Sequence, residues 1–269
     1  MSTAFDKEGL PEDLLTSKTI GDRKIKTDGT PKDYYVEVAL GNVEGSVGVG
    51  RVSRSDATNS SESLPIWGGD SHIEFATSNE VWSVASDSEN DNIIGTGARA
   101  IRVVYLDEDY VEQVSIIELN GTTPVQVGID CFRPSNASVI GAGSSNHNEG
   151  ELVISNTASS PMAYIKPTIC DSKDTYYTVP AGKELILGKV SPYLGKDDSG
   201  EIKGLVSFFG SNVVLTVGTF PVYQNTFDIN FEVPFVAPEK TDIWYEFKSN
   251  DTQPTTISLV IEFILKDIE

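Results

Sequence analysis

The chain has 269 residues, of which 39% are apolar, and it carries 40 acidic against 20 basic residues, a formal net charge of −20. That much apolar sequence is enough for one or two buried cores. The acidic balance argues against nucleic acid and anionic membranes as partners, because both would be repelled. The sequence has no apolar run of about 18 residues that would predict a membrane span, and its start lacks the pattern of a secretory signal.

Residues 1–33 are predicted to form an extended N-terminal arm. They mix charged side chains with glycine and proline, among them Gly9, Pro11 and Gly21. Only residues 11–15 suggest a helical turn, with Pro11 at its first position. We expect the arm to dock on a neighbouring molecule, and a disordered terminus is the alternative.

Residues 34–63 are predicted to be a strand followed by a linker. Residues 34–40 alternate apolar and polar side chains, which is typical of a strand. Residues 41–50 contain four glycines and are expected to be a loop, and residues 51–63 are polar and rich in serine. The glycines do not lead from a strand into a helix, so they do not predict a dinucleotide site.

The stretch 93–127 is the clearest β pattern, and it forms the centre of a first predicted domain over residues 64–156. Strands are predicted at 99–106 and 111–119, around an acidic turn. Asn120-Gly121 then predicts a type I′ hairpin into a third strand at 122–127, completing a meander. Pro124 indicates an edge strand or the start of a strand.

Further short strands are expected on both sides of this meander. They lie at 72–76, 80–85, 131–132, 139–140 and 151–155, with Phe75, Val81 and Trp82 as core candidates. About seven or eight short strands separated by turn residues are typical of a β-sandwich.

A second domain is predicted over residues 157–269. Its strands are expected at 162–170, 176–179, 183–187, 205–209, 212–217, 225–233, 243–248 and 256–265. The last of these is long and apolar, which predicts a central position in a sheet. The predicted fold class is therefore all-β, with two β-sandwich or jelly-roll-like domains behind the arm.

The sequence contains few candidates for catalysis. His72 and His147 are the only histidines, and there is no Gly-x-Ser-x-Gly motif to carry a nucleophile. A zinc site needs three or four histidine or cysteine ligands, and no cluster supplies them. Forty acidic residues make pairs of carboxylates common by coincidence. We therefore assign no catalytic, cofactor-binding or metal-binding residues and predict that the chain is not an enzyme.

Two loop motifs have a structural and a functional interpretation. The acidic loops at 87–92 and 107–109 have carboxylates that suit calcium, but they lack the spacing of a helix-loop-helix site and are expected to be solvated. Gly95-Thr-Gly-Ala-Arg runs straight into a strand, so it predicts a bend rather than a phosphate cradle.

The tryptophans and cysteines also leave alternatives open. Trp67, Trp82 and Trp244 are expected in the core, and a sugar-binding platform is the alternative. Cys131 and Cys170 are expected to be buried thiols, with a disulfide between them as the alternative.

Several turn-and-strand motifs together resemble virion structural proteins of tailed bacteriophages, particularly marine ones. The motifs are Trp67-Gly-Gly, Gly95-Thr-Gly-Ala-Arg, Tyr105-Leu-Asp-Glu-Asp-Tyr, Leu119-Asn-Gly-Thr-Thr-Pro-Val, Gly150-Glu-Leu-Val-Ile and Tyr177-Thr-Val-Pro-Ala-Gly-Lys, flanked by Leu40-Gly-Asn-Val-Glu-Gly and Pro238-Glu-Lys-Thr-Asp-Ile. The resemblance covers about residues 40–265 and does not include the arm. It implies a particle component without enzymatic activity, found in the virion and assembled in the host cytoplasm.

We expect a capsid-associated decoration, spike or head-fibre protein, anchored through its arm to the major capsid protein or another virion protein. Closed oligomers cover sheet edges, so a homotrimer or another cyclic homo-oligomer is predicted. The alternatives are a tail, neck or baseplate component, and a β-sandwich module that binds host surface glycans.

Overall fold

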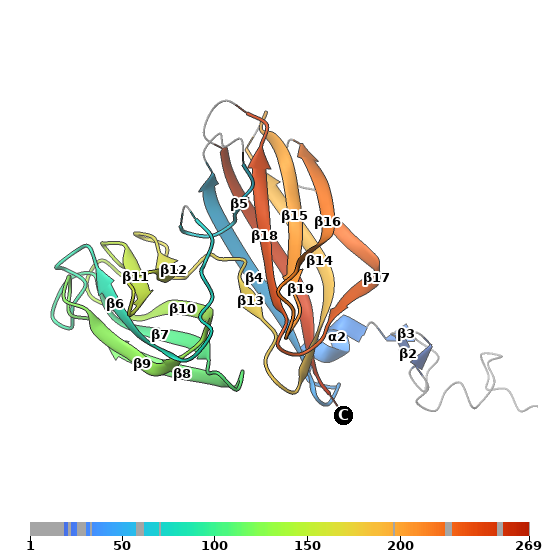
Figure 1. The fold of residues 1–269 in the computed structure, drawn as a ribbon, viewed down its shortest axis with the longest axis horizontal. Helices are drawn as coiled ribbons and strands as arrows, with labels where there is room; N and C mark the ends of the chain where they lie inside the picture. Colours follow the sequence, from blue (N-terminus) through green and yellow to red (C-terminus); the bar gives the residue numbers. More distant parts are fainter. Residues whose placement is uncertain are drawn as a thin grey trace, which may run out of the picture.

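The computed structural model describes residues 19–20, 23–25, 31–32, 34–57, 62–69, 71–195, 197–223, 228–251 and 255–268. Two antiparallel β-sandwiches of unequal size lie side by side (Figure 1), which confirms the all-β prediction. Most of the predicted arm lies outside the described residues. Its described parts, β1 (Thr19–Ile20), β2 (Arg23–Ile25) and β3 (Pro31–Lys32), form a small three-stranded sheet.

The large sandwich consists of two sheets. In one, the order is β17 (Ile229–Ala237), β14 (Lys183–Leu194), β19 (Thr255–Asp267) and β4 (Ser46–Ala57). In the other, the order is β13 (Tyr177–Thr178), β18 (Asp242–Ser249), β15 (Ser199–Ser207) and β16 (Val214–Tyr223), with β5 (Leu64–Pro65) paired to β18. The apolar strand β19 lies between β14 and β4, so its predicted central position is confirmed.

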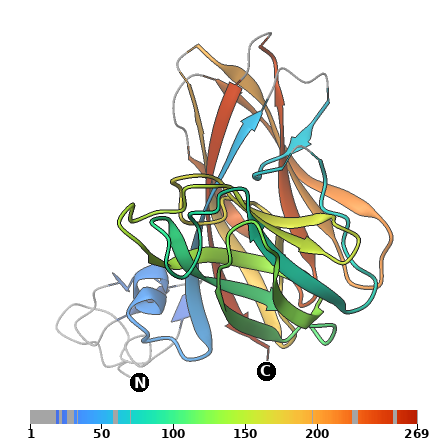
Figure 2. The ribbon, with the colours of Figure 1, turned by 90° about the vertical axis from the view of Figure 1, so that its left-hand side faces the viewer.

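The small sandwich faces the viewer in Figure 2. One sheet has the order β10 (Arg133–Ala142), β7 (Ala98–Leu106) and β8 (Glu112–Glu118). The other has the order β12 (Pro161–Ile165), β11 (Leu152–Asn156), β6 (Glu80–Ser86) and β9 (Val125–Cys131). Its strands all come from the chain between β5 and β13, so the small sandwich is an insertion into the large one.

Strand pairing crosses both of the expected domain limits. β4 comes from the predicted linker, yet it pairs with β19 from Ser46 to Ala57. β12 lies beyond residue 156, yet it pairs with β11 of the small sandwich.

Two predictions near β4 were wrong. Residues 34–40 were expected to form a strand, but residues 34–39 form the short helix α2 (Tyr34–Ala39). Part of the expected loop at 41–50 is strand, because β4 begins at Ser46. The glycines of β4 are not required by close packing, since a Cβ on Gly48 would lie 3.9 Å from Val38, an ordinary contact, and one on Gly50 would have no heavy atom within 4 Å. Pairing with the central strand β19 outweighs the low strand propensity of glycine.

The predicted meander was correct in its strands and wrong in its last connection. β7 pairs with β8, but β9 pairs with β6 in the opposite sheet. Asn120-Gly121 therefore carries the chain between sheets instead of closing a hairpin. Gly121 has a φ of 61°, while the positive φ that a type I′ turn also needs at Asn120 is absent. The Gly121 N–H donates to the Asp91 carbonyl, which draws this turn towards the loop before β7.

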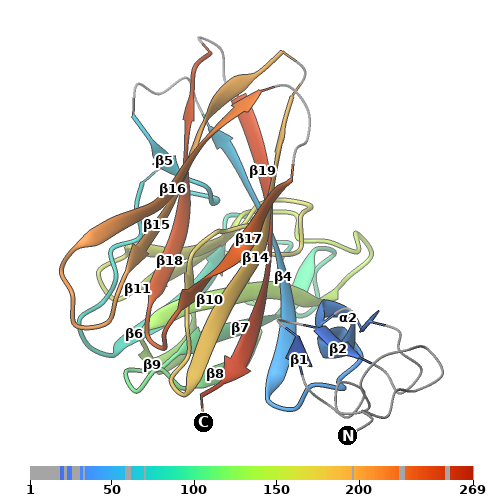
Figure 3. The same cartoon turned by 90° about the vertical axis from the view of Figure 1, so that its right-hand side faces the viewer.

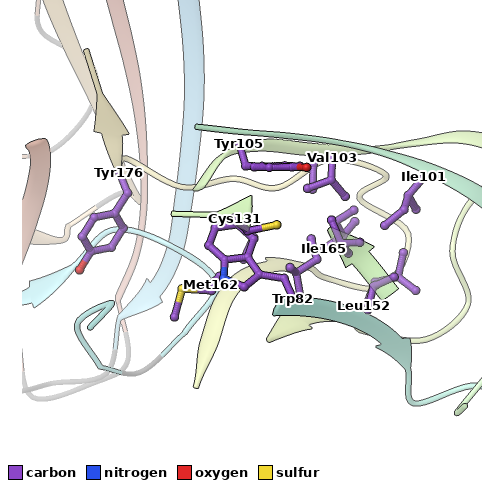
Figure 4. Close-up of a cluster of buried hydrophobic side chains, with 14 of the residues drawn as sticks. Trp82, Ile101, Val103, Tyr105, Cys131, Leu152, Met162, Ile165 and Tyr176 are labelled. Atoms are coloured by element: carbon purple, nitrogen blue, oxygen red, sulfur yellow. The ribbon is translucent and has the colours of Figure 1, made fainter. Parts of the chain in front are cut away.

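The core of the small sandwich forms between its two sheets (Figure 4). Trp82 is fully buried there, and Phe75 packs against the same cluster, as predicted. Val81 is 42% exposed, so its predicted place in the core was wrong. Residues 72–76 are not a strand. A second core fills the large sandwich, around Phe247, Ile202 and Ile257. Within the described residues, no helix has the length and apolarity needed to span a membrane.

Candidate functional site

The two histidines have separate surroundings. His72 Nε2 lies 3.6 Å from Glu246 Oε1, and its Nδ1 lies 3.5 Å from the Tyr176 hydroxyl. His147 Nδ1 lies 2.9 Å from the carbonyl of the next residue, Asn148. Among the described residues, these contacts place neither histidine beside a serine or cysteine nucleophile. Among the residues that the structure describes, no group of three or more histidine, cysteine or acidic side chains could hold a metal ion.

The first acidic loop is organised around one buried carboxylate. Asp91 is fully buried and accepts four hydrogen bonds, from the N–H groups of Ala98, Glu149 and Gly150 and from the Ser86 hydroxyl, at 2.6 to 2.9 Å. Donors with positive partial charge surround the carboxylate and compensate its burial. The loop was predicted to be solvated, and for Asp91 that was wrong.

The glycine motif explains how the loop packs so closely around Asp91. A Cβ on Gly97 would lie 2.1 Å from Asp91 Oδ1, and a Cβ on Gly95 would lie 2.0 Å from the Asn90 carbonyl oxygen. Both distances are far below van der Waals contact. The glycines are therefore required by close approach, in agreement with the predicted bend and not with a phosphate cradle.

Glu149 lies on the solvent side of the same loop cluster. Its carboxylate accepts hydrogen bonds from Ser145, Thr96 and Asn90, at 2.5 to 2.7 Å. These bonds, of which the one from Ser145 has the largest effect, lower the pKa of Glu149.

The second acidic loop is also held by hydrogen bonds to a carboxylate. Asp107 accepts bonds from the N–H groups of Asp109 and Val111 and so shapes its own turn.

The three tryptophans do not form an exposed platform. Trp67, Trp82 and Trp244 are 1%, 0% and 8% exposed, as expected for core residues. Trp67 also donates from Nε1 to the Ser71 carbonyl. The tryptophan-based form of the glycan-binding alternative is therefore wrong.

The cysteines are both free. Cys131 is fully buried, and burial raises the pKa of its thiol to about 12. Cys170 is partly exposed and has a φ of 63°. The disulfide alternative was wrong, and the prediction of a buried thiol holds for Cys131 alone.

Two buried arginines connect the sandwiches, each with an acidic partner, and sequence reasoning missed both. Arg133 on β10 donates to Asp242 on β18, with Nε 3.1 Å from Oδ1. Its guanidinium lies over the Phe132 ring, 4.1 Å from the centroid, and also donates to the Ala76 carbonyl. Such a contact between residues 109 positions apart leaves no periodic signal in the sequence.

The second pair links β4 to the segment that leaves the small sandwich. Arg51 Nη2 lies 3.0 Å from Asp174 Oδ1 and also donates to the Ser135 carbonyl. Burial raises the pKa of Asp174, although Arg51 opposes this effect. Arg133 and Arg51 thus both make contacts across the junction of the two sandwiches.

Two open grooves flank this junction. The β4 groove, of about 480 Å³, lies between the large and small sandwiches; among its lining residues are Val47, Val49, Arg51, Arg102, Val104 and Glu112. The Trp67 groove, of about 400 Å³, is lined in part by Arg54, Tyr164, Lys166, Thr168 and Lys173. In the Trp67 groove Lys166 pairs with Glu151 and Lys173 with Asp171, so these charges already have partners within the fold.

Comparison with known proteins adds only weak similarities. No family model matches the chain, and no curated protein matches it. Among solved structures, that of the infectious bursal disease virus Gx strain matches with 10% identity over 87% of this chain and 82% of that chain, with a TM-score of 0.21. The crystal structure of the STIV MCP matches with 10% identity over 80% and 96%, with a TM-score of 0.22. TM-scores this low do not establish a shared fold.

Proposed function

We propose that this chain is a non-enzymatic structural protein of a virus particle, specifically a capsid-associated decoration, spike or head-fibre protein of a tailed bacteriophage. The motif resemblance over residues 40–265 supports the class of protein. The observation that carries the proposal is the construction of the body: the two sandwiches are joined by the buried pair Arg133–Asp242 and by Arg51, which pairs with Asp174 and donates to the Ser135 carbonyl on β10. A rigid body of this kind suits a component that must hold its shape within an assembly.

The surface chemistry supports the same role. A net charge of −20 keeps many copies soluble at high local concentration. In this proposal the partners are further copies of the chain, in a homotrimer or another cyclic oligomer, and the major capsid protein or another virion protein. The arm at 1–33 is the proposed anchor, and the proposed location is the virion, with assembly in the host cytoplasm.

Purified particles provide the test. An antibody raised against the small sandwich should label intact particles in immunogold electron microscopy, with gold over the heads. Gold confined to tails would replace the capsid assignment with a tail, neck or baseplate one. Absence of the chain from purified particles, measured by mass spectrometry, would contradict the virion role itself.

A further inference from the structure

One long segment of this acidic chain contains no charge. Residues 204–227 include no Asp, Glu, Lys or Arg, although 22% of the whole chain is charged. This segment contains β16, which is the end strand of its sheet. β17 is the end strand of the facing sheet, and Figure 3 shows both strands on the side of the large sandwich away from the small one.

Apolar side chains are exposed along both end strands. We call them the β16–β17 strip: Val213, Val214, Leu215, Val217, Tyr223, Val233 and Val236. Scattered exposed apolar residues are ordinary, but a run of them along two end strands that face each other suits an interaction surface.

Leu215 shows that the core of the large sandwich is open on this side. In the register of β15 and β16, Leu215 lies opposite Val206. Opposite residues of an antiparallel pair point to the same face of the sheet. Val206 is fully buried in the core, whereas Leu215 is 45% exposed. The side chain therefore points towards the interior but lacks a complete cover.

The facing strand β17 explains part of this opening. Its register with β14 passes from Asn230 opposite Lys189 to Phe235 opposite Leu187, which leaves residues 231–234 in a bulge. Val233 in this bulge is 84% exposed. Phe220 and Phe231 still meet between the two strands, with ring centroids 6.3 Å apart.

We propose that the β16–β17 strip is the surface through which this chain associates with a second copy of itself. Two copies that each carry a net charge of −20 repel one another over most of their surfaces, and this effect is smallest where the uncharged segment faces its own counterpart. A strongly basic partner would instead favour the acidic surfaces. A standard stable interface buries about 800 Å² on each partner, so a contact centred on the strip would also cover the side chains around it.

This inference deepens the self-association within the proposed function, and it is tested in solution without particles. Sedimentation velocity would compare the wild-type chain with the double variant Val214→Lys and Leu215→Lys, since lysine on a free edge opposes strand pairing. The control is Ile116→Lys, because Ile116 is 69% exposed on β8, an end strand of the small sandwich. Circular dichroism would confirm folding, and Val214→Lys alone serves as a milder variant if the double variant does not fold.

The expected result is an oligomer for the wild type and the Ile116→Lys control, and single chains for the strip variants. If both strip variants still form the oligomer, the inference is overturned, and the chain assembles through another surface. A wild type that stays a single chain at about 0.1 mM would also overturn it, because a stable self-association has a Kd well below that concentration. If that single chain still binds particles through the strip, the occupant is a different protein. The immunogold result does not depend on any of these outcomes.

Discussion

Arg133 on β10 and Asp242 on β18 form a buried ion pair that crosses from the small sandwich to the large one. Thr178 on β13 donates to the same carboxylate at 2.6 Å, so three strands meet at Asp242. Neither charged residue is more than about a tenth exposed. Removing one partner leaves the other charge desolvated, and this is far more costly than loss of a surface pair.

Replacement of Arg133 by methionine should therefore lower the free energy of unfolding by about 3–5 kcal/mol, measured by urea denaturation. Arg102→Met, at a half-buried arginine on the neighbouring strand β7, is the control and should cost less than about 1 kcal/mol. The double variant Arg133→Met and Asp242→Leu should recover much of the loss, because no unpaired charge remains. Equal losses for Arg133→Met and Arg102→Met would contradict this role for the pair.

Gly97→Ala should destabilise the small sandwich, because the added methyl would occupy the position of Asp91 Oδ1. Overpacking of this kind costs about 1–3 kcal/mol. Gly141→Ala is a matched control on β10, where the nearest heavy atom to a new Cβ is 3.6 Å away, and it should change stability by less than about 0.5 kcal/mol. Thermal unfolding of both variants measures the difference in stability. Similar melting temperatures would show that Asp91 and its neighbours can move to accommodate the added methyl group.

The two thiols should differ in reactivity. Cys131 is fully buried with a raised pKa, whereas Cys170 is partly exposed. A thiol-specific chromophore should therefore label one cysteine per native chain and both in denaturant, because the thiolate is the reactive form. Cys170→Ser should abolish native labelling, while Cys131→Ser should leave it unchanged. Rapid labelling of the Cys170→Ser variant under native conditions would show that the core opens at Cys131.

Glu149 should contribute a pH-dependent part of stability. Its pKa is lowered below 4.5 in the folded chain, so its contribution is complete above pH 4.5 and is lost as the pH falls through the folded value. Glu149→Gln should therefore melt below the wild type near neutral pH, and the gap should narrow in acid. The control is Glu108→Gln, because Glu108 is exposed in the other acidic loop, and it should leave the melting temperature at neutral pH nearly unchanged. A gap for Glu149→Gln that stays constant from pH 7 to about pH 3 would assign its effect to hydrogen bonding alone.

Some features of the candidate sites could be predicted from the sequence, and others could not. The bend at Gly95-Thr-Gly-Ala-Arg could be predicted, because glycine before a strand has a local meaning. Its cause could not, since the carboxylate that excludes a side chain at Gly97 is held by donors from the distant residues Glu149 and Gly150. The ion pairs of Arg133 and Arg51 were missed for the same reason.

Local patterns in the sequence determined the all-β class, the strands β7 and β8, and the central place of β19. Alternation and β-branched residues act between neighbours in the chain, so they can be read from sequence alone. Only the tertiary structure decided which strands pair. The Asn120-Gly121 turn leads to the opposite sheet because loop 88–97 holds its backbone, and β4 becomes a strand because β19 offers a partner edge. It also decided which apolar residues stay uncovered: Leu215 and Val206 look alike in sequence, and only the packing of the facing sheet buries one and exposes the other.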